Sequence, residues 1–182
     1  MLIVNILYSP PPDGDDASST YADRAVEYLN SIKEVSLGYV GPLQINDNDG
    51  VLPWYIEQNN TTEEDIIITI FLISCSADGS VHRNIRKIMR KIPKDVNVKP
   101  NNDNNNKQHF FVIAALGHAR CENSANQMAD TIFATARRFD KVMFSSGIFD
   151  ISVKWKRLET QVELTGPEVD FDPWLKSLIQ SI

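Results

Sequence analysis

Two thiols and one imidazole are the side chains of this sequence that could pair as a nucleophile and its base. The chain has two cysteines, Cys75 and Cys121, and His118 lies three residues before the second. A nucleophilic pair needs hydrogen-bond reach and a third group that orients the base, and spacing shows neither. We therefore predict no catalytic residue and expect both cysteines to be buried, reduced thiols. No two histidines have the spacing of metal ligands, so we expect no metal site.

Other polar side chains could bind a ligand without reacting. Ser18, Ser19 and Thr20 place three hydroxyl groups directly before a predicted helix, where backbone N–H groups favour an anion. Residues 76–80 read Ser-Ala-Asp-Gly-Ser, a small-residue turn between an apolar run and a second helix. The three hydroxyl groups also suffice as a helix cap, with Thr20 and Asp23 resembling a capping box, and we favour the cap.

Continuous apolar runs predict the strands that position these groups. Such runs, rich in β-branched residues, are typical of strands covered on both faces of a parallel sheet. We predict strands at residues 2–9, 34–41, 65–74, 109–117 and 141–147. The alternating stretch 152–166 predicts a solvent-facing extension or hairpin near the fifth strand.

Apolar residues at helical spacing predict the helices between these strands. The predicted helices span residues 20–32, 79–92, 124–139 and 171–182. We expect Pro93 to end the second helix, because proline removes a backbone donor. We expect Asp172 to cap the last helix, with Pro173 at its first position.

Strands that alternate with helices predict a single α/β domain over all 182 residues, built in three layers. Right-handed crossovers favour a flavodoxin-like five-stranded parallel sheet of order 2-1-3-4-5, with helices on both faces. In such sheets ligands bind outside the carboxyl ends of the strands. The segments after Tyr8, Ile73 and Leu116 are therefore the candidates for a binding site.

Composition limits the partners. The formal net charge is −6 and the pI is about 5.0, which argues against binding along a phosphate backbone. The longest apolar run, at residues 66–73, is too short to cross a membrane, and no leader peptide is visible. We expect a cytoplasmic protein that binds neither nucleic acid nor membrane.

Three stretches resemble the FMN domains of diflavin reductases, with methionine synthase reductase and its relatives as the nearest comparison. IFLISCSADGSVHRNIRKI resembles the third-strand segment of that family, where a small-residue turn precedes a helix. FVIAALGHARCENSANQMADTI resembles the segment after it, and VDFDPWLKSL resembles the last helix. The resemblance covers nearly the whole chain, although each motif is only partly kept.

The resemblance implies an FMN site built from three loops. By position, the FMN contacts would come from Ser18, Ser19, Thr20, Ser76, Ala77, Asp78, Gly79, Gly117, His118 and Cys121. The family places hydroxyl groups around the phosphate in the first loop, backbone contacts in the second, and Gly-Asp followed by a stacking tyrosine in the third.

Each loop departs from the family pattern. The first loop carries three prolines, which lack N–H donors, together with Asp13, Asp15 and Asp16, whose charges repel a phosphate. No aromatic lies in the second loop, His118 takes the Asp position of the third, and Cys121 lies near the Tyr position. A lost stacking platform costs about 0.5–1.5 kcal/mol, and about 1.4 kcal/mol is tenfold in affinity. We predict that no cofactor is bound, with FMN as the alternative if Trp54, Tyr55 or Trp155 enters the site.

One helix face is strongly basic and could dock a protein partner. Its charged residues are Arg83, Arg86, Lys87, Arg90 and Lys91. In an acidic chain such a face is suited to an acidic partner.

The sequence leaves two candidate functions. The preferred one is a module that has lost FMN and serves protein interaction or complex assembly. The alternative is an FMN-binding electron-transfer domain that passes electrons to or from a separate protein.

Overall fold

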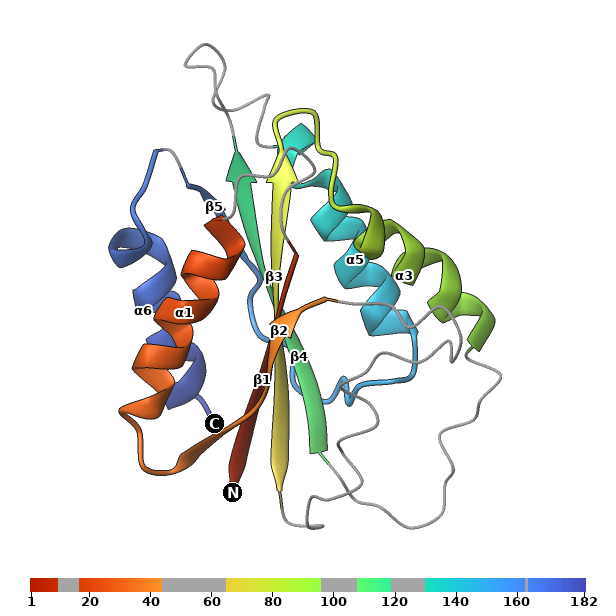
Figure 1. Cartoon of the computed structure of the whole chain (residues 1–182). Coiled ribbons are helices and arrows are strands. Elements are labelled where there is room, and N and C mark those ends of the chain that lie inside the picture. Colours follow the sequence, from red (N-terminus) through yellow and green to blue (C-terminus); the bar gives the residue numbers. More distant parts are fainter. Residues whose placement is uncertain (10–16, 44–64, 96–107, 119–129, 163) are drawn as a thin grey trace.

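The computed structural model describes residues 1–9, 17–43, 65–95, 108–118, 130–162 and 164–182, without the side chains of residues 93–95 (Figure 1). Cys121, Trp54, Tyr55 and the three loop aspartates lie outside these residues. So does the first part of the helix that we predicted at residues 124–139.

Five parallel strands form one sheet in the order β2-β1-β3-β4-β5, as the sequence predicted. The strands are β1 (Leu2–Ser9), β2 (Val35–Pro42), β3 (Ile66–Ser76), β4 (Gln108–His118) and β5 (Leu158–Gln161). β3 lies at the centre and pairs along its full length with β4. The two longest apolar runs of the sequence therefore form the middle of the sheet, where both faces are covered.

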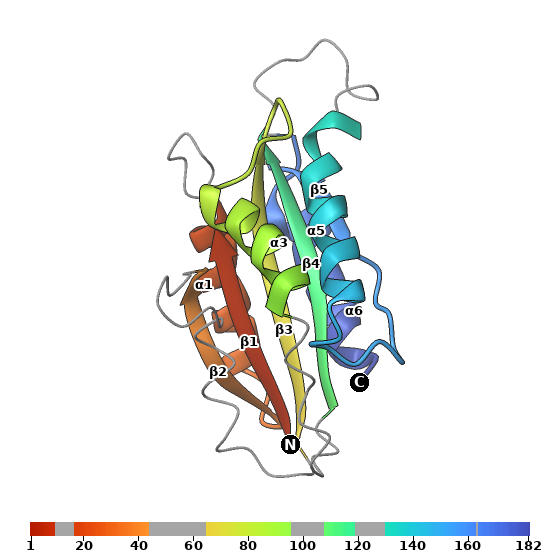
Figure 2. The ribbon, with the colours of Figure 1, turned by 90° about the vertical axis from the view of Figure 1, so that its right-hand side faces the viewer.

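Helices cover both faces of the sheet, which gives the three predicted layers (Figures 1 and 2). One face carries α1 (Ala17–Asn30) and α6 (Pro167–Gln180), and the other carries α3 (Arg83–Asp95) and α5 (Ala134–Ser145). Alternate residues of β3 divide between the two cores. Ile70 and Leu72 pack with α1 and α6, whereas Phe71 and Ile73 pack with α3 and α5.

The prediction for the fifth strand was wrong. Residues 141–145 belong to α5, and the strand is instead β5, within the stretch expected to form an extension or hairpin. Ala136, Phe139 and Met143 are buried at spacings of three and four, so they continue one helical stripe. β5 pairs over only four residues with β4, and a strand that short leaves little periodicity to detect.

The predicted starts of two helices were also wrong. α1 begins at Ala17, so Ser18, Ser19 and Thr20 lie inside its first turn and the predicted capping box does not form. α6 begins at Pro167 after Gly166 as N-cap, which places Asp172 inside the helix. There Asp172 accepts two hydrogen bonds from Arg24 of α1, at 2.7 and 2.5 Å. The carboxylate thus joins two helices instead of capping one.

The third helix is shifted along the chain relative to the prediction. α3 begins at Arg83, four residues after Gly79, because Gly79 has a φ of +78° that a right-handed helix does not allow. It continues two residues beyond Pro93, which we expected to end it. Proline near the end of a helix removes one backbone hydrogen bond, and the final turn tolerates that loss.

A row of polar side chains crosses the sheet within the core on the α3 and α5 side. The Asn5 amide donates to Thr69 Oγ1 at 3.4 Å, and Thr69 Oγ1 lies 2.9 Å from Nε2 of His109. Asn5 Oδ1 also accepts from the Tyr39 backbone N–H at 2.8 Å. The row links β2, β1, β3 and β4, so it specifies their register where apolar packing alone would permit a slip.

Candidate functional site

The ends of β1, β3 and β4 meet at the carboxyl edge of the sheet. Ser9 pairs with Ile73, and Ser76 pairs with His118. The three segments singled out from the sequence therefore do lie together, as parallel strands require. The described part of this edge consists of Ser9, the head of α1, the turn at residues 76–80, and the end of β4.

At the head of α1, Ser18 is fully buried and its hydroxyl group donates to the carbonyl oxygen of Ser9 at 2.8 Å. This bond ties the first turn of α1 to the end of β1. Its donor proton is consequently used inside the chain. Ser19 is half-buried and Thr20 is exposed.

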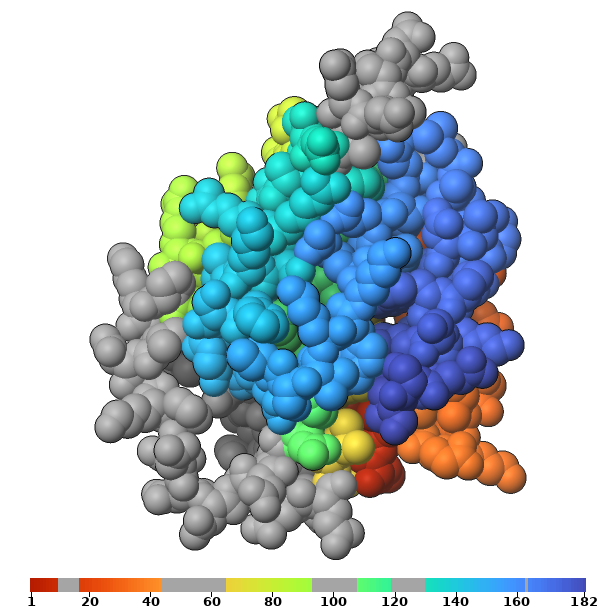
Figure 3. Space-filling model, turned by 180° about the vertical axis from the view of Figure 1, so that it is seen from behind, coloured from red at the N-terminus to blue at the C-terminus, as the bar shows by residue number. Residues whose placement is uncertain are grey.

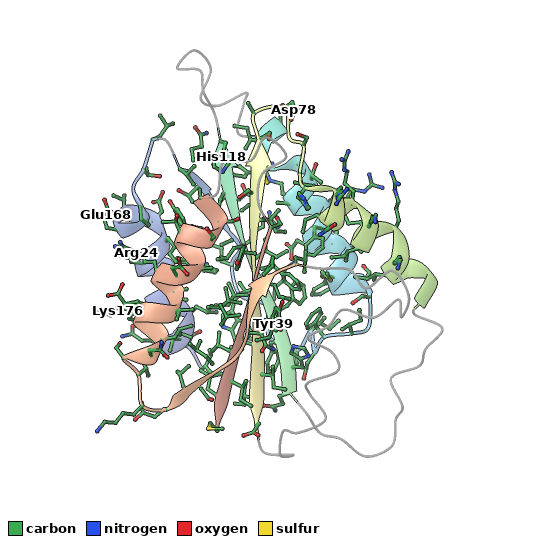
Figure 4. All side chains as sticks on the ribbon, viewed as in Figure 1. Arg24, Tyr39, Asp78, His118, Glu168 and Lys176 are labelled. Atoms are coloured by element: carbon green, nitrogen blue, oxygen red, sulfur yellow. The ribbon has the colours of Figure 1, made fainter. Side chains whose placement is uncertain are left out.

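The turn at residues 76–80 satisfies much of its own backbone. The Ser76 N–H donates to the Ser80 carbonyl at 2.9 Å, and the Gly79 N–H donates to the Ser76 carbonyl at 2.8 Å. The Ser80 N–H donates to Asp78 Oδ1 at 2.8 Å. These hydrogen bonds from Ser80 lower the pKa of the Asp78 carboxyl, which stays ionised. Asp78 is exposed at the tip of the turn (Figure 4).

Gly79 fixes this turn against the start of α5. A Cβ atom at Gly79 would lie 2.3 Å from the carbonyl oxygen of Thr131, so no larger residue fits. The Thr135 hydroxyl donates to the Gly79 carbonyl at 2.6 Å. The Asp-Gly pair that drew attention in the sequence is therefore a packing element between two segments more than fifty residues apart.

Gly117, at the end of β4, likewise makes room for the chain itself. A Cβ atom there would lie 2.8 Å from Ile132 and 3.0 Å from the ring of Phe133. His118 follows on the opposite face of the sheet, since it shares its side with Leu116 of the α1 and α6 core. His118 is 5% exposed. Gly117 and His118 therefore face the two different cores of the sheet.

The nucleophile that would combine Cys75 with His118 does not exist. Cys75 is buried among Phe71 and Ile73 on the α3 and α5 side, across the sheet from His118. Burial raises the pKa of its thiol to about 12, so the reactive thiolate is absent at neutral pH. This result agrees with the expectation of a structural thiol for Cys75.

Several described residues at this edge make contacts within the chain. The buried Ser18 hydroxyl is used by Ser9, and an ionised Asp78 stands at the tip of the second loop. No aromatic side chain occurs at residues 76–80 or at Gly117 and His118. Trp155, a possible substitute, instead packs edge-to-face on Phe110 at 5.3 Å. Phe110 lies eight residues before His118 on β4, about 26 Å away along the strand.

The basic face of α3 is the other candidate site, and it lies on the outside of the molecule. Arg83, Arg86, Lys87 and Arg90 are exposed and Lys91 is half-buried. Side chains ending in nitrogen project from α3 away from the sheet (Figure 4). Within the described part of the chain, no carboxylate forms an ion pair with Arg83, Arg86 or Arg90.

The neighbouring arginines on α5 and before β5 behave differently. Arg137 binds Glu159 at 2.7 Å and Asp130 at 2.7 Å, and Arg157 binds Glu159 at 2.8 Å and also Asp140. Arg137 lowers the pKa of the Glu159 carboxyl, as does Arg157 to a lesser degree. Among the residues that the structure describes, Arg137 and Arg157 are thus paired with carboxylates, whereas Arg83, Arg86 and Arg90 of α3 are not.

Two further features bear on the predicted partners. Among the described residues no group of histidine, cysteine, aspartate or glutamate side chains has the arrangement of a metal site. None of the helices in the described ranges combines the length and apolar character needed to span a bilayer.

Comparison with known proteins places the fold. No protein-family model matches the chain, and no curated protein sequence does. A cysteine-to-serine variant of flavodoxin from Pseudomonas aeruginosa matches with a TM-score of 0.58 at 14% identity, over 98% of this chain and 96% of that one. A cysteine-to-alanine variant of the same protein gives a TM-score of 0.53, also at 14% identity and the same coverage.

Oxidised flavodoxin 1 from Bacillus cereus gives a TM-score of 0.48 at 12% identity, over 97% and 94% of the two chains. At such identities the likeness to the Pseudomonas protein establishes a flavodoxin-like α/β fold and nothing finer. It agrees with the strand order 2-1-3-4-5 seen here.

Proposed function

We propose that this chain is a flavodoxin-like module that works without FMN and docks a protein partner with an acidic surface. The observation that carries the proposal is the basic stripe of α3. This helix has a net charge of +5, from six basic residues and Asp95. Because the whole chain has a net charge of −6, the remainder carries −11. A local field opposite to that of the molecule steers and orients an acidic partner.

The stripe is not explained by the stability of α3. The helix carries three pairs of like charges four residues apart, namely Arg83 with Lys87, Arg86 with Arg90, and Lys87 with Lys91. Each such pair destabilises a helix by about 0.2–0.5 kcal/mol. A set of charges that opposes the fold is best accounted for by contacts outside the chain. This supports α3 as the docking surface.

The contacts at the carboxyl edge support the absence of FMN. Ser18, Gly79 and Gly117 are positions where the family resemblance implies flavin contacts, and each of them serves packing within the chain. Asp78 Oδ1 likewise accepts a hydrogen bond from the Ser80 N–H of its own turn. The proposal therefore treats this edge as a structural remnant.

An FMN electron-transfer domain of the diflavin type is the second candidate. It is favoured by the flavodoxin-like fold and by the partial motifs that resemble diflavin FMN domains. Such a domain would also need a protein surface for its electron partner, and α3 would serve equally well. Flavin content is therefore the property that separates the two candidates.

The first experiment measures flavin directly. The chain is purified from cells grown with riboflavin, its visible spectrum is recorded, and FMN is then titrated while its fluorescence is followed. We expect a colourless protein and no quenching at micromolar FMN. Co-purified yellow absorbance, or quenching that a Ser18→Ala change weakens, would replace the proposal with the electron-transfer alternative.

The second experiment tests the docking surface with a defined acidic probe, a fluorescent poly-glutamate peptide of twenty residues. We expect binding that weakens steeply with salt, and at least a tenfold loss of affinity in the double variant Arg86→Glu, Arg90→Glu. A matched control reverses two charges away from α3, Lys141→Glu and Lys176→Glu. Equal losses in both variants would mean that net charge alone binds the probe, and the docking role of α3 would be rejected.

A further inference from the structure

A groove lies beside β5, at the edge of the sheet between α5 and α6. It has a volume of about 640 Å³ and runs between α5, the segment before β5, and α6. Its main contributors are Asp140, Lys154, Trp155, Lys156, Arg157 and Trp174. Figure 3 shows this side, where residues 146–162 lie between α5 and α6. Its volume falls in the range of small-ligand sites, but five charged side chains line it beside the two indole rings, so a ligand bound there must itself carry charge.

The two indole rings of the groove are held in place by hydrogen bonds inside the chain. Trp155 Nε1 donates to Ser181 Oγ at 2.9 Å, and its ring packs on Phe110. Trp174 Nε1 donates to the Lys156 carbonyl oxygen at 2.9 Å. Both indole donors are therefore in use, and both rings are only partly buried. What the rings offer a ligand is flat aromatic surface, already oriented, and not a hydrogen bond.

The charges of the groove leave two lysines uncompensated. Arg157 pairs with both carboxylates that line the groove, Asp140 and Glu159. Within the described residues Lys154 and Lys156 form no ion pair, and both are exposed. Lys154 Nζ lies 4.8 Å from the ring centre of Phe144, at the side of the groove. The groove thus combines preoriented aromatic walls with a local positive charge, in a chain that is acidic overall.

Lysines beside an edge strand also protect a sheet against pairing with another copy. That role explains a positive charge next to β5. The two tryptophans pack with one part of each ring against the core on the α1 and α6 side, and the part that stays exposed borders the groove. The two features together point to a ligand that is both flat and negatively charged.

We propose that this groove binds a planar aromatic anion, of which a nucleoside monophosphate is the simplest example. The ring of the ligand stacks on an indole, and its phosphate is neutralised by Lys154 and Lys156. Because neither indole donates a hydrogen bond to the ligand, the site distinguishes bases by stacking area and not by their edges. The groove is separate from the carboxyl edge, so this inference stands independently of the proposed absence of FMN.

Adenosine monophosphate is the first probe, titrated into the full chain at low salt and followed by isothermal calorimetry. We expect binding in the micromolar to low-millimolar range, at least tenfold weaker binding of adenosine, and no measurable binding of ribose 5-phosphate or inorganic phosphate. Uridine monophosphate should bind less tightly than the adenine nucleotide, since its ring is smaller. Binding of phosphate alone at equal strength, or no binding of the nucleotide at 5 mM, would overturn the proposal.

The position of the ligand is tested by variants and by the indole N–H resonances. The exposed pair Lys154→Gln, Lys156→Gln should lose at least tenfold in affinity, whereas the control pair Lys141→Gln, Lys176→Gln should lose less than twofold. In a ¹H–¹⁵N spectrum the nucleotide should shift the indole signals of Trp155 and Trp174 and leave that of Trp54 in place. Equal losses in the two lysine variants, or a shift of Trp54 alone, would refute the site.

Two more titrations distinguish a mononucleotide from a nucleic-acid strand, and FMN in the groove from FMN at the carboxyl edge. A six-residue oligodeoxyadenylate should bind no more tightly than the mononucleotide, because the rest of the chain is acidic. Affinity that rises with length would reject a small-ligand site in favour of a nucleic-acid strand. FMN bound in the groove would be lost in Lys154→Gln, Lys156→Gln, whereas FMN bound at the carboxyl edge would be retained, so the two proposals fail in distinguishable ways.

Discussion

The turn at residues 76–80 and helix α3 follow one another in the chain, yet they use their polar groups in opposite ways. In the turn, the Gly79 carbonyl, the Ser80 N–H and the Asp78 carboxylate are bonded within the chain. In α3, Arg86 and Arg90 point into solvent with no ion pair among the described residues. The fold accounts for the residues of the turn. It gives Arg86 and Arg90 no ion pair among the described residues, which is why we propose a partner for this helix.

The difference shows that a sequence motif does not by itself reveal what its residues do in the structure. The turn resembles a cofactor loop, but its contacts are those of a packing element. The helix resembles an ordinary solvated face, but its repelling charges oppose the stability that such a face normally has. Substitutions in the turn should therefore alter folding and spare binding, and substitutions in α3 should do the reverse.

The largest effect on folding is expected at Gly79. Gly79→Ala should lower the free energy of unfolding by about 2–4 kcal/mol, from the left-handed backbone and the clash with the Thr131 carbonyl together. Gly147→Ala is the matched control, since Gly147 has a φ of +70° but no atom within 4 Å of a Cβ. Urea unfolding measures both. Equal losses would show that the packing against α5 contributes nothing.

The next effect is a dependence of the free energy of unfolding on pH. We expect it to come from His109 in the sheet and not from α3. Burial lowers the pKa of His109 to about 3. Below pH 6.5 the unfolded chain takes up a proton that folded His109 does not, so acid destabilises the fold. The loss is about 1.4 kcal/mol per pH unit, or about 2 kcal/mol at pH 5.

His109→Gln should remove most of this slope in urea unfolding between pH 7.5 and 5. His82 at the head of α3 is the control. Its pKa is also lowered, first by burial and then by Arg83 and Arg86, but the side chain is far less enclosed than His109. His82→Gln should therefore leave most of the slope in place. If His82→Gln removed the pH dependence of stability and His109→Gln did not, the effect would come from His82 and not from His109.

A smaller effect is expected at Ser18. Ser18→Ala removes the hydroxyl group that donates to the Ser9 carbonyl, which should cost about 1 kcal/mol of stability. Ser177→Ala, at an exposed position of α6, controls for the change in helix propensity and should be close to neutral. Thermal unfolding is a sufficient measurement. If Ser18→Ala left the stability unchanged and abolished FMN binding, the Ser18 hydroxyl would serve a ligand site and not the stability of the fold.

The smallest effect on folding is expected in α3. Arg86→Gln with Arg90→Gln should change the free energy of unfolding by less than about 0.5 kcal/mol, and in the stabilising direction, because the repulsion of Arg86 and Arg90 for each other and for neighbouring like charges is removed. The same variant should bind the acidic peptide less tightly. Destabilisation beyond 1 kcal/mol would show that these arginines support the fold and would remove the contrast between the two regions.

Much of the architecture was predictable because it rests on local patterns. Continuous apolar runs predicted four of the five strands, and the strand order followed from right-handed crossovers between them. Ile85, Ile88 and Ile92 are buried at the spacing expected for α3. By contrast, the prediction missed β5 and misplaced ends of all four helices. The carboxyl edge was located correctly, but the direction of its side chains was not predictable.

The sequence by itself determined which segments are apolar on two faces, which helices carry a buried stripe, and that α3 is strongly basic. Those properties depend on residues a few positions apart. The tertiary structure decided that Ser18 bonds to Ser9, that Gly79 packs against Thr131, and that two tryptophans border a groove beside two exposed lysines. Such contacts join residues far apart in the chain, and only the packing of the layers brings them within hydrogen-bond reach.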